Sequence, residues 1–271
     1  MQRVTGIGGI FFKANDAKAL AKWYEDHLGI GFGKNLYFSF SWRVNNNTLS
    51  PASTSLGIFS DKSDYFDPST KQLMLNLRVE NLEELLKVLK QEGVNVQDKM
   101  DKYAYGNFGW IVDPEGNKIE LWEPIESGFG EDEKDDAEKM KTLTRVTGIG
   151  GIFFKSKNQP QLLEWYDKHL GITFTESYHT FKWIDFNDKK KTGSSAFSIF
   201  KDTTKYLEPS QKEFMINFRV KNLEALVNDL KNEGVQSVGA FEKYEYGNFA
   251  WIMDPEGNKI ELWEPVDEKL E

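Results

Sequence analysis

The sequence predicts an α+β protein made of two copies of one domain. The segment RVTGIGGIFFK begins at Arg3 and again at Arg145, and YGNF begins at Tyr105 and again at Tyr246. The two copies are therefore offset by 142 residues at the front (145 − 3) and by 141 at the back (246 − 105). This period indicates a duplicated domain, because solenoid repeats run only about 20–50 residues. Within each copy, strand-like and helix-like segments alternate, which is the second observation behind the α+β prediction.

The first half of each copy predicts a strand, a helix and two further strands. In the first copy, apolar residues recur at helical spacing through residues 16–28, and Gly29 ends that helix. The other apolar runs are short and rich in residues that favour strands. We predict strands at residues 6–13, 37–44 and 54–59.

The second half begins again with a strand and a helix. Residues 82–92 are amphipathic at helical spacing and are closed by Gly93. Further strands are predicted at residues 73–79, 94–102, 108–112 and 118–123. The run DPEGN at residues 113–117 predicts a tight turn, since it lacks the alternating oxygen ligands of a calcium loop. Each copy is therefore predicted to contain two β-α-β-β-β modules, and the chain four.

Strand parity assigns a candidate cleft, because successive side chains point to opposite faces. In residues 73–79 the odd positions are all apolar and suit packing against helices, whereas the even positions include Asn76 and Arg78. In residues 118–123, Glu120 and Trp122 share the face away from the helices. Helices cover one face, so the other face is expected to line a concave cleft. The predicted ligand-binding residues are Asn76, Arg78, Trp110 and Trp122 in the first copy and Asn217, Arg219, Trp251 and Trp263 in the second.

Composition narrows the class of function. The 271 residues carry a formal net charge of −9 without basic clusters, which argues against nucleic acid and membrane surfaces as partners. The chain has no cysteine, which excludes disulfides and thiolate metal sites. No apolar run is long enough to span a bilayer and the N-terminus has no signal core, so we expect a cytoplasmic protein. The acidic residues 126–144 predict a linker between domains at residues 1–125 and 145–271.

Two motifs resemble the vicinal oxygen chelate superfamily, the group of glyoxalases, bleomycin resistance proteins and extradiol dioxygenases. WYEDHLGI, from Trp23, is similar to its aromatic-Tyr…Leu-Gly signature. VDPEGNKIELWEP, from Val112, is similar to its closing segment, and both motifs recur in the second copy. The resemblance covers nearly all of both copies. It implies two glyoxalase-like domains, each an incomplete barrel of two βαβββ modules around a cleft, which dock as an intramolecular pseudo-dimer.

The same resemblance implies a divalent metal held by a His late in the first strand, a His at the start of the fifth and a Glu in the last. Those positions fall on Gly9, Met74 and Glu120 in the first copy and on Gly151, Met215 and Glu261 in the second. One carboxylate per cleft is fewer than the three protein ligands such a site needs. We therefore expect no metal and no other cofactor. His27 and His169, in the last turns of their helices, are expected to interact with the helix dipole.

Glu120 and Glu261 allow three interpretations. Each is a former ligand kept as a hydrogen-bond acceptor, a general base whose pKa an aromatic pocket raises, or half of an ion pair with Arg78 or Arg219 on the same sheet face. We favour the ion pair, because a buried carboxylate without a partner is costly.

The predicted function is binding of a small organic molecule in a metal-free cleft in each domain, as the resemblance to bleomycin resistance proteins implies. One alternative is a glyoxalase-type lyase or isomerase with Glu120 and Glu261 as catalytic bases. A second alternative is a structural or regulatory protein with vestigial clefts. Fold alone does not choose among these, since one fold hosts many functions.

Overall fold

The computed structural model describes residues 3–45, 47–125 and 145–269, so the predicted linker at 126–144 lies outside the described residues. The first copy contains β1 (Val4–Ala14), α1 (Ala17–Leu28), β2 (Tyr37–Val44), β3 (Asn47–Ser60), η1 (Asp64–Phe66), β4 (Leu73–Val79), α2 (Leu82–Gln91), β5 (Asn95–Tyr103), β6 (Gly106–Val112) and β7 (Lys118–Pro124). The second contains β8 (Val146–Ser156), α4 (Gln159–Leu170), β9 (Tyr178–Asp185), β10 (Thr192–Lys201), β11 (Phe214–Val220), α5 (Leu223–Asn232), β12 (Ser237–Tyr244), β13 (Gly247–Met253), β14 (Lys259–Pro265) and η2 (Asp267–Lys269). Among these residues no helix has the length and apolar character to cross a membrane.

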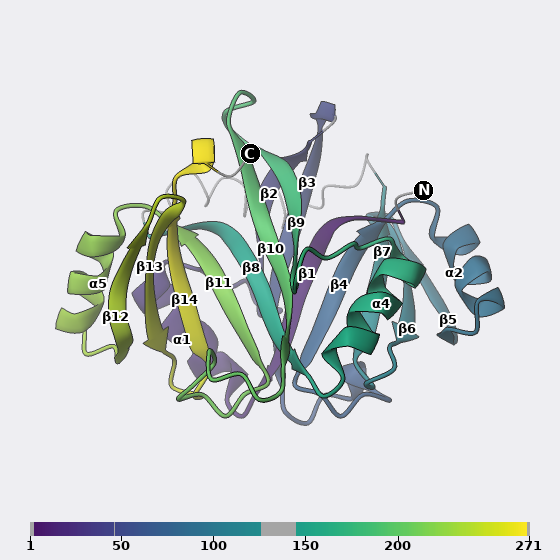
Figure 1. Ribbon diagram of the computed structural model, residues 1–271, viewed down its shortest axis with the longest axis horizontal. Helices are drawn as coiled ribbons and strands as arrows, with labels where there is room; N and C mark the ends of the chain where they lie inside the picture. The colour runs from purple at the N-terminus through teal and green to yellow at the C-terminus, as the bar shows by residue number, and fades with distance from the viewer. Residues whose placement is uncertain (1–2, 46, 126–144, 270–271) are drawn as a thin grey trace.

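The strands form one curved, unclosed sheet, which confirms the predicted α+β class (Figure 1). Its order is β12-β13-β14-β11-β8-β10-β9-β2-β3-β1-β4-β7-β6-β5. In the first copy β1 pairs in parallel with β3 and antiparallel with β4, and β4 pairs in parallel with β7. The second copy repeats this pattern around β8 and β11. Each copy therefore has a convex face, covered by helices, and a concave face.

The two strands predicted after the first helix are present as β2 and β3, so the first module of each copy has one strand fewer than the full βαβββ pattern. Residues 29–36 contain no strand, so one edge of β2 has no neighbour from its own copy. The matching edge of β9 pairs with it instead, with Trp42 opposite Asp185 and Val44 opposite Trp183. An open edge favours such pairing because its amide and carbonyl groups lack partners. The missing strand thus explains why the two copies share one sheet.

The first helix of each copy packs against strands of its own copy, β1 and β3 in the case of α1, and also contacts the sheet of the other copy. Asp16 caps α1 by accepting a hydrogen bond from Ala19 N, and Gly29 ends the helix in the left-handed region at φ 73°. Tyr24, on the buried face of α1, lies 6.1 Å from the Phe218 ring in the second copy. Figure 1 shows α1 behind β11 and β14, and α4 in front of β4 and β7. The buried side chains of both copies form one hydrophobic core, so the expected docking of the copies is an interlocked one.

Ion pairs related by the pseudo-twofold axis also join the copies. Glu92 accepts from Arg3, with 2.5 Å between Arg3 Nη2 and Glu92 Oε1, and lies 2.7 Å from His169 Nδ1 of the second copy. Arg145, Glu233 and His27 repeat this group. The two helix-end histidines therefore each contact a side chain of the other copy. Their partner in each case is a carboxylate of the other copy, which the sequence did not predict.

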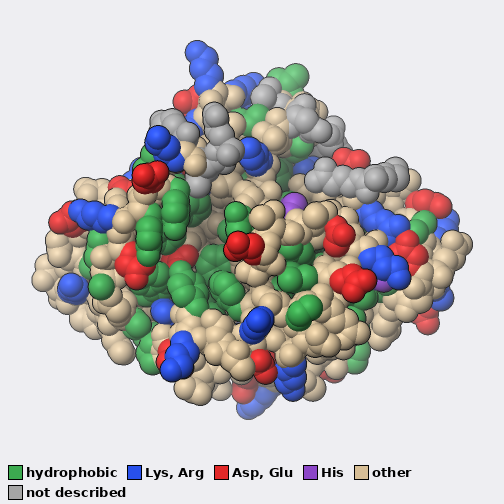
Figure 2. Space-filling view, viewed as in Figure 1, with side chains coloured by type: hydrophobic (Ala, Val, Ile, Leu, Met, Phe, Trp, Pro, Cys, Tyr) green, Lys and Arg blue, Asp and Glu red, His purple; other side chains and the backbone are tan. Residues whose placement is uncertain are grey.

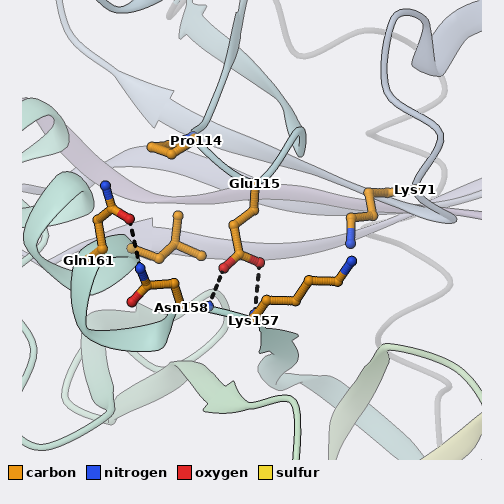
Figure 3. A pocket seen from close by; sticks show the side chains of 7 residues that line it. Lys71, Pro114, Glu115, Lys157, Asn158 and Gln161 are labelled. Atoms are coloured by element: carbon orange, nitrogen blue, oxygen red, sulfur yellow. Dashed lines mark hydrogen bonds between the residues drawn. The ribbon is translucent and has the colours of Figure 1, made fainter.

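The DPEGN turns link the copies as well. Asp113 Oδ1 accepts hydrogen bonds from the backbone N–H groups of Glu115 and Asn117, which confirms the predicted turn. The Glu115 side chain reaches the start of α4 in the second copy and accepts from Asn158 N at 2.7 Å and Lys157 N at 3.0 Å (Figure 3). Glu256 accepts equivalently from Asp16 N at 2.9 Å. A carboxylate beside free N–H groups at a helix start is stabilising.

Candidate functional site

A buried glutamate lies on the concave face of each copy. Glu120, in β7, has Asn76 of β4 and Trp110 of β6 as its neighbours in the strand register. Only 2% of Glu120 is exposed. Asn76 Nδ2 donates to Glu120 Oε1 at 2.7 Å, Trp110 Nε1 donates to Oε2 at 2.9 Å, and the Tyr65 hydroxyl also donates to Oε2. Three donors from three elements therefore replace the water that a buried carboxylate loses.

Tyr65 is held over the glutamate by its own backbone as well as by its hydroxyl. It lies in η1, where Tyr65 N donates to Ser63 Oγ. Lys118 Nζ donates to the Tyr65 carbonyl oxygen at 2.6 Å and lies 5.4 Å from the ring centroids of Tyr65 and Trp110. Burial lowers the pKa of Lys118, whereas the charge of Glu120 raises it. Lys118 thus supplies a positive charge near the glutamate and fixes η1 across the concave face.

Burial favours the neutral forms of the ionisable groups at this site. Burial raises the pKa of Glu120 because the ionised carboxylate loses hydration, while its three hydrogen bonds act in the opposite direction. Burial and the charge of Glu120 raise the pKa of Tyr65. Tyr65 therefore stays a neutral O–H donor near neutral pH. Glu120 holds a proton at a higher pH than an exposed glutamate does.

The second copy repeats the arrangement. Glu261, also 2% exposed, accepts hydrogen bonds from Tyr206, Asn217 and Trp251, the last at 2.8 Å. Burial raises the pKa of Glu261, as it does for Glu120. Lys259 donates to the Tyr206 carbonyl oxygen at 2.6 Å, in the role of Lys118. Both copies of the duplicated domain therefore contain the same arrangement of Glu, Tyr, Asn, Trp and Lys side chains.

The predicted ion pairs of Arg78 with Glu120 and of Arg219 with Glu261 are wrong. Arg219 pairs instead with Asp267, and its guanidinium lies 5.1 Å from the Trp183 ring centroid. Arg78 lies 5.8 Å from the Trp42 ring centroid. Strand parity placed the arginines on the correct face of the sheet, but it did not give their distance from the glutamates along the strand. Arg78 lies beside Trp122 in the register, two positions from the glutamate, or roughly 6.6 Å along the strand.

The predicted residue Trp122 begins an aromatic wall. Its ring stacks on Phe108, with centroids 6.2 Å apart and planes at 11°. The wall continues to Tyr105 and Tyr103, which stack on each other at 5.3 Å and are 45% and 50% exposed. Gly106 makes this possible, because a Cβ there would lie 2.2 Å from Trp122 Nε1. Trp263, Phe249, Tyr246 and Tyr244 form the same wall in the second copy. Figure 2 shows that copy's concave face, hollowed and lined with hydrophobic side chains.

The residues around each glutamate do not fit a divalent metal. Across the described residues, no group of three or more His, Cys, Asp and Glu side chains is placed to hold a metal ion. Met74, at the implied histidine position, packs in a cluster with Phe11, Phe66 and Trp110. The neighbours of Glu120 turn N–H and O–H donors toward its carboxylate and so occupy the oxygens that a cation would need. The three hydrogen-bond donors stabilise the buried Glu120 carboxylate, which a bound metal ion would otherwise do.

Sequence reasoning missed the tyrosines and lysines of the site. Tyr65 and Tyr206 lie in a segment of which only four of nine positions are identical between the copies, DKSDYFDPS against DTTKYLEPS. Their retention at the same offset was the available signal. Lys118 and Lys259 follow the closing turns and have the same strand parity as Glu120 and Glu261, so parity was the available signal for them. Of the predicted residues, Asn76, Trp110 and Glu120 come together in the first copy and Asn217, Trp251 and Glu261 in the second.

Comparison with known proteins places this geometry in a family. No curated protein sequence matches the chain significantly. The Mn(II)-bound glyoxalase of Novosphingobium aromaticivorans is 12% identical, with a TM-score of 0.62 over 97% of this chain and 83% of that one. The 2,3-dioxygenase LapB of Pseudomonas sp. KL28 is 13% identical, with a TM-score of 0.60 over 97% and 93%. The family model of the glyoxalase/bleomycin resistance protein/dioxygenase superfamily matches residues 6–121 and 149–262. The chain therefore belongs to this superfamily, as a tandem duplication of its domain.

Proposed function

We propose that each copy binds a small, partly aromatic organic molecule in its concave cleft without a divalent metal. The observation that carries the proposal is the buried glutamate, whose oxygens accept from a Tyr, a Trp and an Asn beside an aromatic wall. Pockets that combine apolar walls with a few fixed polar groups are typical of small-molecule sites. Neither Met74 nor Gly9 offers a metal the further ligands it needs.

Within the cleft the residues have separate roles. Asn76 and Trp110 hold the Glu120 carboxylate in place, and the stacked rings of Trp122 and Phe108 offer a face to a planar ligand. Tyr65 occupies the outer lone pair of Glu120 Oε2, where a donor group of the ligand competes with it. Asn217, Trp251, Glu261 and Trp263 have the matching roles in the second copy. Arg219 serves no ligand in this scheme, since it pairs with Asp267.

A specific observation also favours proton transfer as a second candidate function. Burial raises the pKa of Glu120 toward the range in which a carboxylate serves as a general base. The Tyr65 hydroxyl donates directly to that carboxylate and offers a path for a proton. A lyase or isomerase of glyoxalase type needs such a group to remove a proton next to a carbonyl. Lys118, as the nearby cation, would stabilise negative charge that develops there.

One set of measurements tests the binding proposal. The full chain, purified without chelator, is analysed for bound elements and screened by thermal shift against Mn²⁺, Ni²⁺, Zn²⁺ and a panel of aromatic carboxylates, phenols and amines. We expect no stoichiometric metal and a rise in melting temperature with at least one organic compound. The double variant Glu120→Gln/Glu261→Gln should lose that rise. Glu123→Gln, on the opposite face of β7, is the matched control.

Two results would contradict the proposal. One is a stoichiometric divalent ion that the double variant abolishes, which would make the glutamates metal ligands. The other is a complete lack of compound-induced shifts, which would favour vestigial clefts. To separate binding from catalysis, each compound that binds is incubated with the protein in D₂O and followed by NMR. Exchange of a C–H next to a carbonyl, lost in the double variant, would establish the proton-transfer function.

A further inference from the structure

The two clefts differ at one matched position in a way that decides where a tyrosine lies. Gly57 of β3 stands opposite Tyr37 of β2 and Phe11 of β1 in the sheet register. A Cβ at Gly57 would lie 2.8 Å from Tyr37 Cε1 and 2.9 Å from Phe11 Cδ1. The Tyr37 ring therefore occupies the space that a side chain at position 57 would fill. It packs edge-on against Phe11 and Phe59, with centroid distances of 5.5 Å and 5.7 Å.

In the second copy the corresponding residue is Ser198, between Tyr178 and Phe153 in the register. Ser198 is buried, so its side chain takes up the space in which Tyr37 rests in the first copy. Tyr178 is 47% exposed, and within residues 3–45, 47–125 and 145–269 it makes no aromatic ring contact. Phe153 keeps its contact with Phe200, at 5.8 Å. The one glycine-to-serine difference thus accompanies the loss of a tyrosine from the cleft.

A second difference acts in the same direction. Phe66, fully buried in the first cleft, is replaced by Leu207 in the second. The apolar cluster of the first cleft is Phe11, Phe66, Met74 and Trp110, with Tyr37, Phe59 and Phe108 against it. The cluster of the second is Phe153, Leu207, Met215 and Trp251, with Ala196, Phe200, Val238 and Phe249 against it. The second cleft therefore has two aromatic rings fewer around the same glutamate.

We propose that the second cleft is the wider one and binds a larger planar aromatic molecule, and that Tyr37, seated on Gly57, closes the first. This inference rests on the proposed function of the clefts as ligand sites. A ligand entering the first cleft has to displace a ring that is packed against two others, whereas in the second cleft only the smaller Ser198 side chain stands at that place. Tyr37 and Gly57 are therefore specificity-determining residues, and Ser198 is their counterpart in the second cleft.

The test uses the full chain and two probes. The neutral three-ring dye 1-aminoanthracene reports ligand binding by fluorescence titration, and tetranitromethane followed by mass spectrometry reports which tyrosines are accessible. In the wild type we expect one dye per chain, with Tyr178 nitrated faster than Tyr37. Tyr37→Ala should add a second dye site. Tyr178→Ala, which removes an exposed ring, should leave one site and is the matched control.

The exchange of the two small residues gives an independent arm. Gly57→Ser should make Tyr37 as reactive toward nitration as Tyr178, and Ser198→Gly should weaken dye binding by about tenfold, or 1.4 kcal/mol. If Gly57→Ser does not fold, Tyr37→Ala carries the same test. Two equivalent dye sites in the wild type, with both tyrosines equally nitrated, would overturn this inference alone. No dye binding in any variant, with Tyr178 still the more reactive tyrosine, would overturn the proposed binding function and the ligand part of this inference together.

Discussion

The hydroxyl of Tyr24 in the first copy donates a hydrogen bond to Asp254 Oδ2 in the closing turn of the second copy, 3.1 Å away. Tyr166 and Asp113 repeat the bond with the copies exchanged, at 3.3 Å. Both tyrosines are fully buried within the shared hydrophobic core. Each domain therefore completes the core of the other, and we expect the duplicated chain to unfold as one cooperative unit.

The first prediction tests this coupling. Tyr24→Phe keeps the ring but leaves the buried Asp254 with one donor fewer, so it should lower the free energy of unfolding by about 1–3 kcal/mol. Urea unfolding followed by tryptophan fluorescence and by circular dichroism should show one transition for both probes. Tyr103→Phe, at an exposed ring, should have little effect. Two separated transitions would show that the copies unfold independently.

The second prediction concerns the loss of folding stability at low pH. Arg3 and His169 beside Glu92, and Arg145 and His27 beside Glu233, lower the pKa of each glutamate from 4.5 to about 2. A carboxyl group whose pKa is lowered in the folded state stabilises it above pH 4.5, and that stability is lost as the pH falls toward 2. The double variant Glu92→Gln/Glu233→Gln should therefore differ most from the wild type near neutral pH and converge with it in acid.

Unfolding free energies measured from neutral pH down to about pH 3 check this second prediction. Glu83→Gln, on an exposed helix surface, is the control and should leave the pH profile unchanged. A difference between the wild type and the double variant that grows in acid would show that these carboxylates are not stabilised by their partners.

The third prediction concerns the pH dependence of the stability that Glu120 contributes. It should run opposite to that of Glu92 and Glu233, because burial raises the pKa of Glu120. The folded protein disfavours the ionised form, so the contribution of Glu120 to stability should decline as the pH rises above the ordinary value of 4.5. Glu120→Gln places an amide among three donors and should cost about 1–3 kcal/mol in acid. The gap to the wild type should narrow toward neutral pH. A gap that widens with pH would mean that Tyr65, Asn76 and Trp110 outweigh the effect of burial.

Strand alternation was enough to predict much of this site. The parity of β4 and β7 placed Asn76, Glu120 and Trp122 on one face, and the structure bears this out. Parity fixes a face but not a partner, and for that reason Arg78 was assigned wrongly to Glu120. The nearest register neighbour of the carboxylate is Asn76, while Arg78 lies against Trp42.

Other features of the fold and the site depend on tertiary contacts, which cannot be predicted from local sequence patterns. Nothing in the α1 sequence indicates that Tyr24 packs on the second copy, because either copy offers it an equivalent apolar surface. The pairing of β2 with β9 depends on the open edge of each strand, and the pattern within one copy does not show which partner covers that edge. Tyr65 reaches Glu120 from a 3-10 turn that has no hydrophobic period.

The last prediction concerns the aromatic wall. A Cβ at Gly106 would lie 2.2 Å from Trp122 Nε1 and 2.9 Å from the Glu123 carbonyl oxygen, so Gly106→Ala forces the indole to move. Displacing a packed side chain typically costs about 1–3 kcal/mol, and the stacking of Trp122 on Phe108 should be lost with it. Near-ultraviolet circular dichroism should report the loss of stacking, and urea unfolding should report the lower stability. Gly33→Ala is the matched control, because the nearest atom to its Cβ would be 3.7 Å away, and it should leave both signals unchanged. An unchanged near-ultraviolet spectrum in Gly106→Ala would show that the wall does not depend on that glycine.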